Sequence, residues 1–215
     1  MPLMIKLNRN IMKVYLSLDN GHFITVDKLA DFIKHHPEMN LHLHYGNTAE
    51  LLKLLDQGKI HMAIVEGNYP KEKYSHKKYS TEDYIAVCAA SHEFKNIPHT
   101  LQDLLDERIL VREKGSGTRH ILQESLNVRG LSISDFIHYI QIENMHTIIS
   151  LLKKDCGISF MYKTAVKEEL QKGILKEIIL DDFKLQHNFE FIWEKDSLFT
   201  EKYISISEEF LTIPF

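Results

Sequence analysis

Apolar strand-like segments alternate with amphipathic helical segments along this chain, and this order limits the possible folds more than any other feature. Strands are predicted at 12–18, 41–45 and 61–67, with helices at 26–36 and 48–57 between them. A helix that connects two strands returns the chain to the same end of the sheet, so the strands run parallel. The first part of the chain therefore predicts a parallel sheet with helices on its faces.

The second part of the chain repeats this alternation after an interruption. Residues 74–92 contain two strand-like pieces without a long helix between them. A second α/β unit follows, which includes a helix predicted at 164–173, and a final strand and helix are left over at the C-terminus. A leftover element of this kind packs back on the first unit, so we predict two lobes joined by two crossing strands, near 86–89 and 190–194. The remaining predicted strands are 109–111, 136–144, 157–162, 174–180 and 187–195.

Composition narrows the class of protein. The 215 residues are 44% hydrophobic and 26% charged, which is typical of a globular chain with a substantial core. The net charge is −4, whereas a surface that binds DNA is normally basic. No apolar run approaches the ~18 residues of a membrane span. We therefore expect a chain that binds neither DNA nor membrane by itself.

Cysteine usage and the N-terminal sequence favour a cytoplasmic location. Cys88 and Cys156 are too few for a disulfide framework, and the opening residues MPLMIKLNRNIMKVYL lack the long apolar core of a secretory signal. Cys88 lies within an apolar strand and Cys156 directly precedes one. We interpret both as small core residues rather than as redox sensors, which need exposure and a low thiol pKa.

The stretch VREKGSGTRHILQESL, residues 111–126, predicts an anion-binding turn. A strand ends there, two glycines let the backbone curl, and a helix begins at once. Ser116 or Thr118 is suited to cap that helix. The backbone N–H groups at a helix N-terminus hold anions or polar oxygens, because they are unpaired and lie at the positive end of the helix dipole. Arg119 is suited to pair with an anion, and solvent and Glu113 are equally available alternatives.

Five groups of residues fall where predicted strands end or the next helices begin. Parallel strands place these positions at one edge of the sheet, where open α/β sheets bind ligands. Asn47 is suited to cap a helix with Glu50 three residues on. Helix capping alone would explain several of the groups individually, so their shared position is what favours a binding site. The candidate effector-binding residues are Ser17, Leu18, Asp19, Asn47, Thr48, Glu66, Gly67, Ser116, Gly117, Thr118, Glu143 and Asn144.

Three stretches, in order, resemble one known family. They are GNTAELLKLLDQGKIHMAIVEG (46–67), REKGSGTRHILQESL (112–126) and ENMHTIISLLKKDCGISFMYKTAVKEELQKGILKEI (143–178). Together they resemble the effector-binding domain of LysR-type transcriptional regulators, over roughly the whole chain from Lys13 onward. The Gly-Ser-Gly-Thr-Arg turn is the most specific of the matching features.

The resemblance implies a two-lobed α/β fold of the type II periplasmic-binding-protein kind. Each lobe is then a mixed, mostly parallel sheet flanked by helices, and two hinge strands cross between the lobes. We expect lobe I to comprise residues 1–87 and 193–215, and lobe II residues 88–192. In this family a winged helix-turn-helix domain and a linker helix precede the sensor. Neither is found before Lys13, so the chain is interpreted as an isolated sensor domain.

The family's function is implied in the same way. The chain is expected to bind a small polar or anionic effector in the interlobe cleft, to form a homodimer or higher homo-oligomer, and to reach DNA only through the missing N-terminal domain. Dimer contacts are expected on the helices at 48–57 and 145–154. Family members often carry hydroxyl residues after the first strand. Here only Ser17 keeps one and Asp19 adds a carboxylate, so the effector's chemistry stays open.

Two other functions fit a similar fold. A stand-alone solute-binding protein of a transport system would have this architecture, but it would need an export signal. A dimerisation domain with a vestigial cleft is the second alternative. A helix-turn-helix encoded upstream of Lys13 would identify a regulator, and a signal peptide there would identify a solute-binding protein.

Enzymatic, metal-binding and cofactor-binding functions are not predicted. The Gly-Ser-Gly-Thr turn lacks the Gly-Lys-Ser/Thr of a phosphate loop, and no Gly-x-Ser-x-Gly nucleophile elbow occurs. Among the 13 histidines, His42 and His44 share one face of a strand, but no Cys-x-x-Cys or His-Glu-x-x-His spacing accompanies them. We expect no metal and no cofactor.

Overall fold

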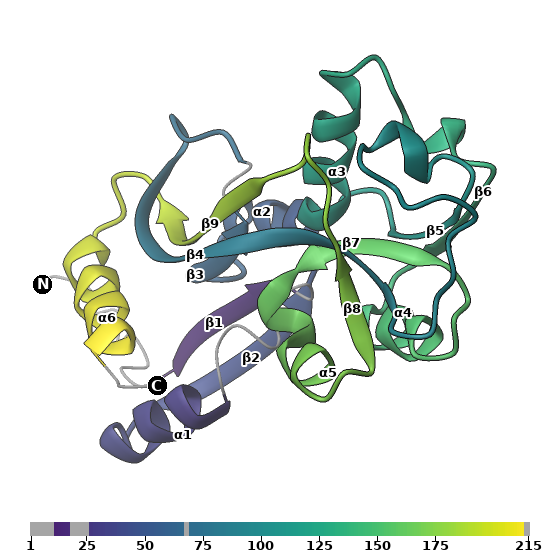
Figure 1. Ribbon diagram of the computed structural model, residues 1–215. Helices are drawn as coiled ribbons and strands as arrows, with labels where there is room; N and C mark the ends of the chain where they lie inside the picture. The colour runs from purple at the N-terminus through teal and green to yellow at the C-terminus, as the bar shows by residue number, and fades with distance from the viewer. Residues whose placement is uncertain (1–10, 18–25, 67–68, 213–215) are drawn as a thin grey trace, which may run out of the picture.

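The computed structural model of the protein describes residues 11–17, 26–66 and 69–212 (Figure 1). Its strands form one sheet in the order β2-β1-β3-β9-β4-β7-β5-β6, with β8 paired to β4. The strands are β1 (Ile11–Ser17), β2 (Asn40–Gly46), β3 (Met62–Glu66), β4 (Tyr74–Ala89), β5 (Arg108–Arg112), β6 (His138–Ile142), β7 (Ile158–Tyr162), β8 (Leu175–Ile178) and β9 (Leu185–Glu194). The helices are α1 (Val26–His35), α2 (Thr48–Asp56), α3 (Gly117–Asn127), α4 (Met145–Leu152), α5 (Lys167–Gln171) and α6 (Thr200–Thr212).

The first half of the sheet is the predicted parallel unit. Strand β1 pairs in parallel with both β2 and β3. Alternate residues of β3 point to opposite faces, as the pleat of a strand requires. Met62 and Ile64 belong to the core shared with Phe32 of α1 and Phe210 of α6. Ala63 and Val65 belong to the core under α2, so helices cover both faces of this half.

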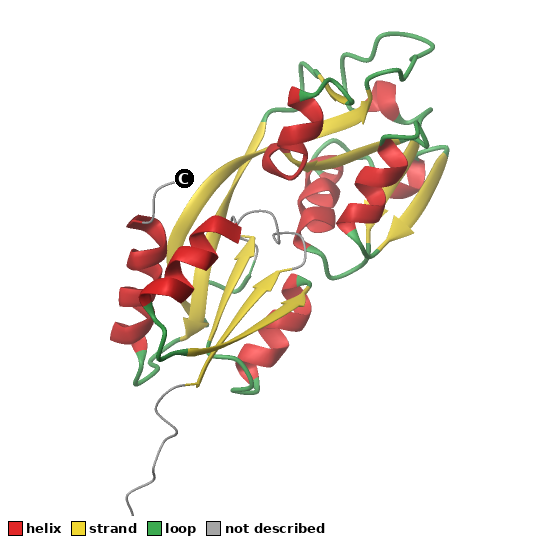
Figure 2. Ribbon diagram, turned by 90° about the horizontal axis from the view of Figure 1, so that it is seen from below, coloured by secondary structure: helices red, strands yellow, loops and turns green. Residues whose placement is uncertain are grey.

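The second half repeats the design around β5, which pairs in parallel with β6 and β7. Leu110 packs in a cluster with Ile148 and Leu152 of α4. Ile109 and Val111 face the other way, into the large core that also holds the apolar residues of α3. The two halves lie at opposite ends of an elongated molecule (Figure 2).

Two long strands connect the halves. β4 and β9 run antiparallel from the pair Tyr74–Glu194 to the pair Tyr84–Leu185, with an irregularity between Lys78 and Ser80. Beyond Tyr84, β4 continues into the second half, where it pairs with β7 and β8. Sequence reasoning expected two strand pieces within 74–92, and this prediction is wrong. The chain forms one continuous strand, because a bulge lets it bend without a turn.

The fold class agrees with the prediction, but three elements differ from it locally. The helix expected from 164 begins as a 3-10 turn at Lys163–Val166 before α5. The strand expected at 136–144 is only β6, an edge strand whose residues 138–141 are exposed. The strand expected over 174–180 is shorter in the structure, because β8 begins at Leu175 and ends at Ile178. The residue boundaries of the two lobes stay a prediction.

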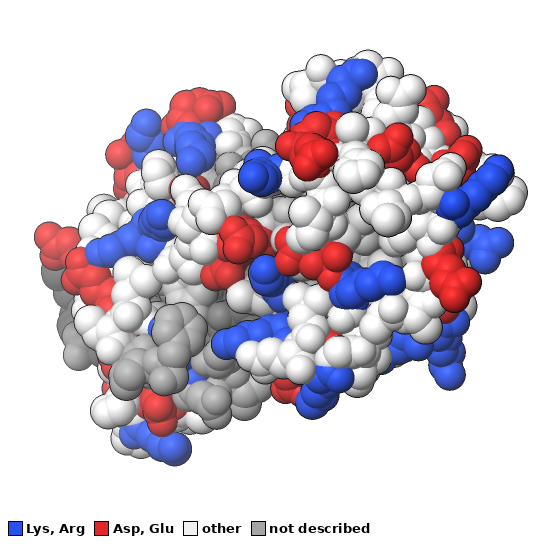
Figure 3. All heavy atoms as spheres, in the orientation of Figure 1, with Lys and Arg blue, Asp and Glu red and all other residues white. Residues whose placement is uncertain are grey.

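The surface and the helices agree with a globular chain. On the face shown in Figure 3, Lys and Arg side chains are interspersed with Asp and Glu side chains. Among the described residues, every helix is too short or too polar to cross a membrane.

Candidate functional site

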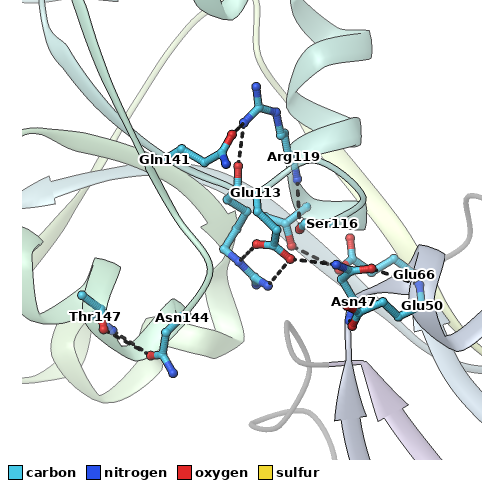
Figure 4. A network of polar contacts seen from close by, with 11 residues as sticks. Asn47, Glu50, Glu66, Glu113, Ser116, Arg119, Gln141, Asn144 and Thr147 are labelled. Carbon is cyan, nitrogen blue, oxygen red and sulfur yellow. Dashed lines mark hydrogen bonds and ion pairs between the residues drawn. The ribbon is translucent and has the colours of Figure 1, made fainter.

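The beginning of α2 and the β5–α3 turn meet where β3 ends (Figure 4). Asn47 caps α2, with its side-chain oxygen accepting the Glu50 N–H at 3.0 Å. The Glu50 carboxylate accepts the Asn47 N–H in return at 3.2 Å. This is the capping box that the spacing of Asn47 and Glu50 predicts.

The start of α2 also contacts the turn before α3 directly. The Asn47 side-chain amide donates to Glu113 Oε1 at 3.2 Å, and the Ala49 N–H donates to the Gly115 carbonyl at 3.3 Å. Gly115 has a φ of +96°, where a side chain would be strained. These contacts join the two halves of the sheet, because Asn47 follows β2 and Glu113 follows β5.

The turn ends at Ser116, which caps α3 as predicted. Its hydroxyl accepts the Arg119 N–H at 3.5 Å. Thr118, in the first turn of the helix, is buried, and its hydroxyl donates to Glu66 Oε1 at 3.1 Å. The start of α3 is therefore bound to the end of β3.

Glu66 is the most unusual of the candidate residues. Its side chain is fully buried, and it accepts hydrogen bonds from Thr118 and, at 3.2 Å, from the Tyr162 hydroxyl. Burial raises the pKa of Glu66 to about 8, against the opposing effect of the two hydroxyl donors. Sequence reasoning placed Glu66 at this edge of the sheet, but the pattern HMAIVEG gave no signal of so deep a burial.

Two tyrosines of the network were missed because they are single aromatic residues in apolar strands. The Tyr84 hydroxyl, on β4, donates to the Thr118 carbonyl at 2.8 Å. Tyr162, on β7, stacks edge-on against Tyr84, with ring centroids 5.2 Å apart. Burial holds the pKa of both phenols well above its ordinary value, so both remain donors. The network thus links the hinge strand β4 to the start of α3.

Gly117 is required by close packing. A Cβ atom on this residue would lie 2.7 Å from Glu66 Oε2 and 3.1 Å from Thr48 Oγ1. With a Cβ atom here the Glu66 carboxyl group would have to move, which would disturb its hydrogen bonds with Thr118 and Tyr162, so glycine is what lets α3 begin this close to β3 and α2. The Gly-Ser-Gly spacing in the sequence indicated a curled backbone, but not this approach.

Two arginines support the turn. Arg112 is buried and pairs with Glu113 through Nε at 2.9 Å and Nη2 at 3.2 Å. Arg119 donates from Nη1 to the Arg112 carbonyl at 2.8 Å and to Gln141 Oε1 at 2.9 Å. Arg119 therefore joins α3 to β5 and β6 rather than to Glu113. Arg112 was not singled out from the sequence, since an arginine at the end of a strand is ordinarily exposed.

A cavity of about 200 Å³ lies between α2 and α3. Thr48, Ser116 and Gly117 line it at the two helix N-termini, and Arg119 and His120 line it from the next residues of α3. Thr48 is only 5% exposed, and its hydroxyl has no hydrogen-bond partner among the described residues. The cavity thus offers an unpaired buried hydroxyl beside two helix N-termini.

The structure brings six of the candidate residues together and leaves the others elsewhere. The six that lie together, where α2, α3 and β3 meet, are Asn47, Thr48, Glu66, Ser116, Gly117 and Thr118. Asn144 caps α4, accepting the Thr147 N–H at 3.0 Å, and lies apart from this network in Figure 4. Its neighbour Glu143 is exposed.

Four candidates cannot be related to the cavity through their side chains. The backbone of Ser17 ends β1 opposite Gly46, and its side chain is not described. Leu18, Asp19 and Gly67 lie outside the described residues. The effector-binding role of all twelve residues stays a prediction.

The hypotheses of a metal site and of a redox-sensing cysteine concern residues outside the place where α2, α3 and β3 meet. Within the described part of the chain, no group of three or more His, Cys, Asp or Glu side chains is placed to hold a metal ion. Cys88 is buried, and burial raises the pKa of its thiol to about 11, the opposite of what a redox sensor needs.

Comparison with known protein families identifies the type of domain. Residues 17–203 match the family described as LysR substrate binding domain. The HTH-type transcriptional regulator YeiE of Escherichia coli is 22% identical over 167 residues, which are 78% of this chain and 56% of that protein. The HTH-type transcriptional regulator CysL of Bacillus subtilis is 22% identical over 84% of this chain and 60% of that protein. The chain thus spans less than two thirds of the length of these relatives.

Solved structures share the fold at low sequence identity. The regulatory domain of CcmR from Synechocystis, solved in complex with 2-PG, superposes with a TM-score of 0.80 at 16% identity and covers 95% of this chain and 99% of that one. A variant of the OxyR2 regulatory domain from Vibrio vulnificus gives 0.79 at 16% identity, covering 95% and 96% of the two chains.

Proposed function

Because the chain belongs to the LysR substrate-binding domain family, we propose that it is the effector-sensing part of a transcriptional regulator. The effector is a small polar or anionic molecule that binds where α2, α3 and β3 converge. One observation carries this proposal: six candidate residues from three separate segments of the sequence gather where α2, α3 and β3 meet, and three of them, Thr48, Ser116 and Gly117, line one cavity there. The complex of the CcmR regulatory domain with 2-PG supports ligand binding by a domain of this fold.

Effector binding would act through the geometry of the two halves. A ligand shifts an equilibrium between two conformations only if it binds one of them more tightly. A ligand between α2 and α3 contacts both halves at once, so it favours the arrangement in which they are close. In the intact regulator this change would reach a DNA-binding domain outside this chain, in the cytoplasm. The family consists of regulators rather than enzymes, and the comparisons give no support to a transport role.

Thermal unfolding against a panel of small acids, amino acids and inorganic anions tests the proposal. A ligand at 100 times its dissociation constant adds about 2.7 kcal/mol to the free energy of unfolding. For a chain of this size that corresponds to a rise of several degrees in Tm. We expect such a rise for one class of compound, and we expect Thr118→Ala and Ser17→Ala to remove it.

Thr212→Ala is the matched control, because Thr212 is an exposed threonine at the end of α6, in a different part of the molecule. It should keep the full rise in Tm. A rise that survives both Thr118→Ala and Ser17→Ala would show that the effector binds elsewhere. No rise with any compound of the panel would count against a working effector site.

A further inference from the structure

Two helix N-termini face the same small cavity from opposite halves of the molecule. α2 has 9 residues and α3 has 11, so both are long enough to present a helix dipole. The buried Thr48 hydroxyl, which has no hydrogen-bond partner among the described residues, is an additional donor in this cavity. A buried polar group without a partner is costly, and a bound oxygen atom would satisfy it.

One acidic side chain lies directly behind this cavity. Gly117 lines the cavity on one side, and on the other it stands so close to Glu66 that a Cβ atom would come within 2.7 Å of the carboxyl oxygen. Glu66 is 0% exposed, so water does not screen its charge from the cavity.

We propose that this cavity binds a small oxyanion or carboxylate and that Glu66 must be protonated for tight binding. This inference rests on the proposed function and deepens it: it names the class of ligand and makes its binding depend on pH. An ionised Glu66 would repel an anion held on the far side of Gly117, whereas the neutral acid would not. Anion binding therefore retains or takes up one proton at Glu66.

The groups around Glu66 are consistent with a neutral acid near neutral pH. The hydroxyl groups of Thr118 and Tyr162 favour the ionised form, but burial outweighs them, and the nearby Glu113 carboxylate also disfavours ionisation. The charge of Glu113 is itself balanced by the buried Arg112. Because the pKa of Glu66 is raised to about 8, the site should accept anions at pH 7 and lose affinity above pH 8.

Two charged or titratable groups on the other side of the cavity affect the test. Arg119 stays cationic throughout the accessible pH range and adds no pH dependence. His120 is an exposed titratable group in the lining, so the test includes a variant of it. The effect of Glu66 is compared with that of His120 between pH 7.5 and 9.5.

Calorimetric titration with sodium sulfate tests the proposal, because sulfate stays a dianion over this whole range. We expect the sulfate affinity of the unmodified chain to fall at least about tenfold from pH 7.5 to pH 9.5, since charges this close interact strongly at low dielectric. Glu66→Gln, which is neutral at every pH, should give an affinity that is flat over the same range. Thr48→Ala should weaken sulfate binding at pH 7.5.

Two further variants control the comparison. Glu124→Gln removes a carboxylate from an exposed position on α3, and it should leave the fall in affinity unchanged. His120→Gln should also leave the fall in affinity between pH 7.5 and pH 9.5 unchanged, because the proposal assigns that fall to Glu66. If Glu66→Gln showed the same fall as the unmodified chain, the proton linkage would be wrong.

Sulfate failing to bind at any pH would overturn the assignment of an anion cavity. That result remains distinct from failure of the proposed function. If another compound of the thermal panel gave a rise in Tm that Thr118→Ala abolished, the effector-sensing role would stand and only the anionic class would be lost.

Discussion

At the scale of single residues, Glu66 and Gly117 show how closely the site is packed. An acid is seldom buried without a cationic partner, because removing its charge from water is costly. Here two hydroxyl groups donate hydrogen bonds to Glu66, burial raises its pKa, and the missing side chain of Gly117 provides the space. The free energy of unfolding should therefore depend on pH through Glu66.

Glu66 should make the unfolding free energy depend on pH even without ligand. The folded-state pKa is about 8, above the ordinary value of 4.5, so the folded chain holds a proton that the unfolded chain has lost between these values. Stability from this source is complete below pH 4.5 and decreases by roughly 1.4 kcal/mol for each pH unit up to about 8. Glu66→Gln should abolish this decrease and be more stable than the unmodified chain at pH 8.

Urea denaturation at pH 6, 7 and 8 measures this effect. The exposed substitution Glu124→Gln is again the matched control and should change the pH dependence little. A Glu66→Gln variant that lost stability as steeply as the unmodified chain between pH 6 and 8 would show that Glu66 is already ionised when folded.

At the scale of elements, two helices begin with the same asparagine cap but differ in what else the cap contacts. Asn47 and Asn144 each accept an N–H of the first turn at 3.0 Å. Only Asn47 also donates to a second segment, through Glu113. The first is therefore both a cap and a contact between the two halves.

Alanine substitution should separate these two roles. Asn144→Ala should cost about 1 kcal/mol, the usual value of an N-cap. Asn47→Ala should cost more, because it also removes one of the donors to Glu113 and breaks the capping box with Glu50. Chemical denaturation of both variants measures the difference, and equal losses would mean that the Asn47–Glu113 contact contributes nothing.

The elements also show what the sequence could and could not predict. The Asn47–Glu50 box, the Ser116 cap and the alternation of β1 to β3 with α1 and α2 follow local rules, and all were predicted. The continuity of β4 was not, since a bulge that bends a strand resembles a break in the pattern. Arg112, Tyr84 and Tyr162 were missed because their roles depend on contacts between residues distant in sequence, which no local spacing encodes.

At the scale of the whole molecule, the described surface offers a more suitable dimer contact than the one predicted from sequence. The apolar faces of α2 and α4 pack on their own sheet, so these helices have less apolar surface for a partner. The edge strand β6 instead exposes Tyr139 and Ile140, 54% and 41% accessible, beside free backbone groups. An unprotected strand edge of this kind favours pairing with another chain.

We expect the chain to form a homodimer that depends on this edge. Tyr139→Ser combined with Ile140→Lys should shift the sedimentation coefficient toward that of a monomer. Ile179→Lys is the control, because Ile179 is 69% exposed but lies after β8. A chain that sediments as a monomer before any substitution, or a dimer unaffected by the double variant, would contradict this prediction.

The pairing of β9 with β3 and β4 also governs the order in which the chain can fold as it leaves the ribosome. Glu66 pairs with Phe189, and Tyr74 pairs with Glu194, so the first half of the sheet lacks its neighbouring strand until residue 194 has been synthesised. Strands β5, β6 and β7 and their helices are contiguous in sequence and need no such wait. Contacts between distant segments form slowly. The first half synthesised is therefore the last to be completed, and its open strand is the part of the nascent chain most in need of a chaperone.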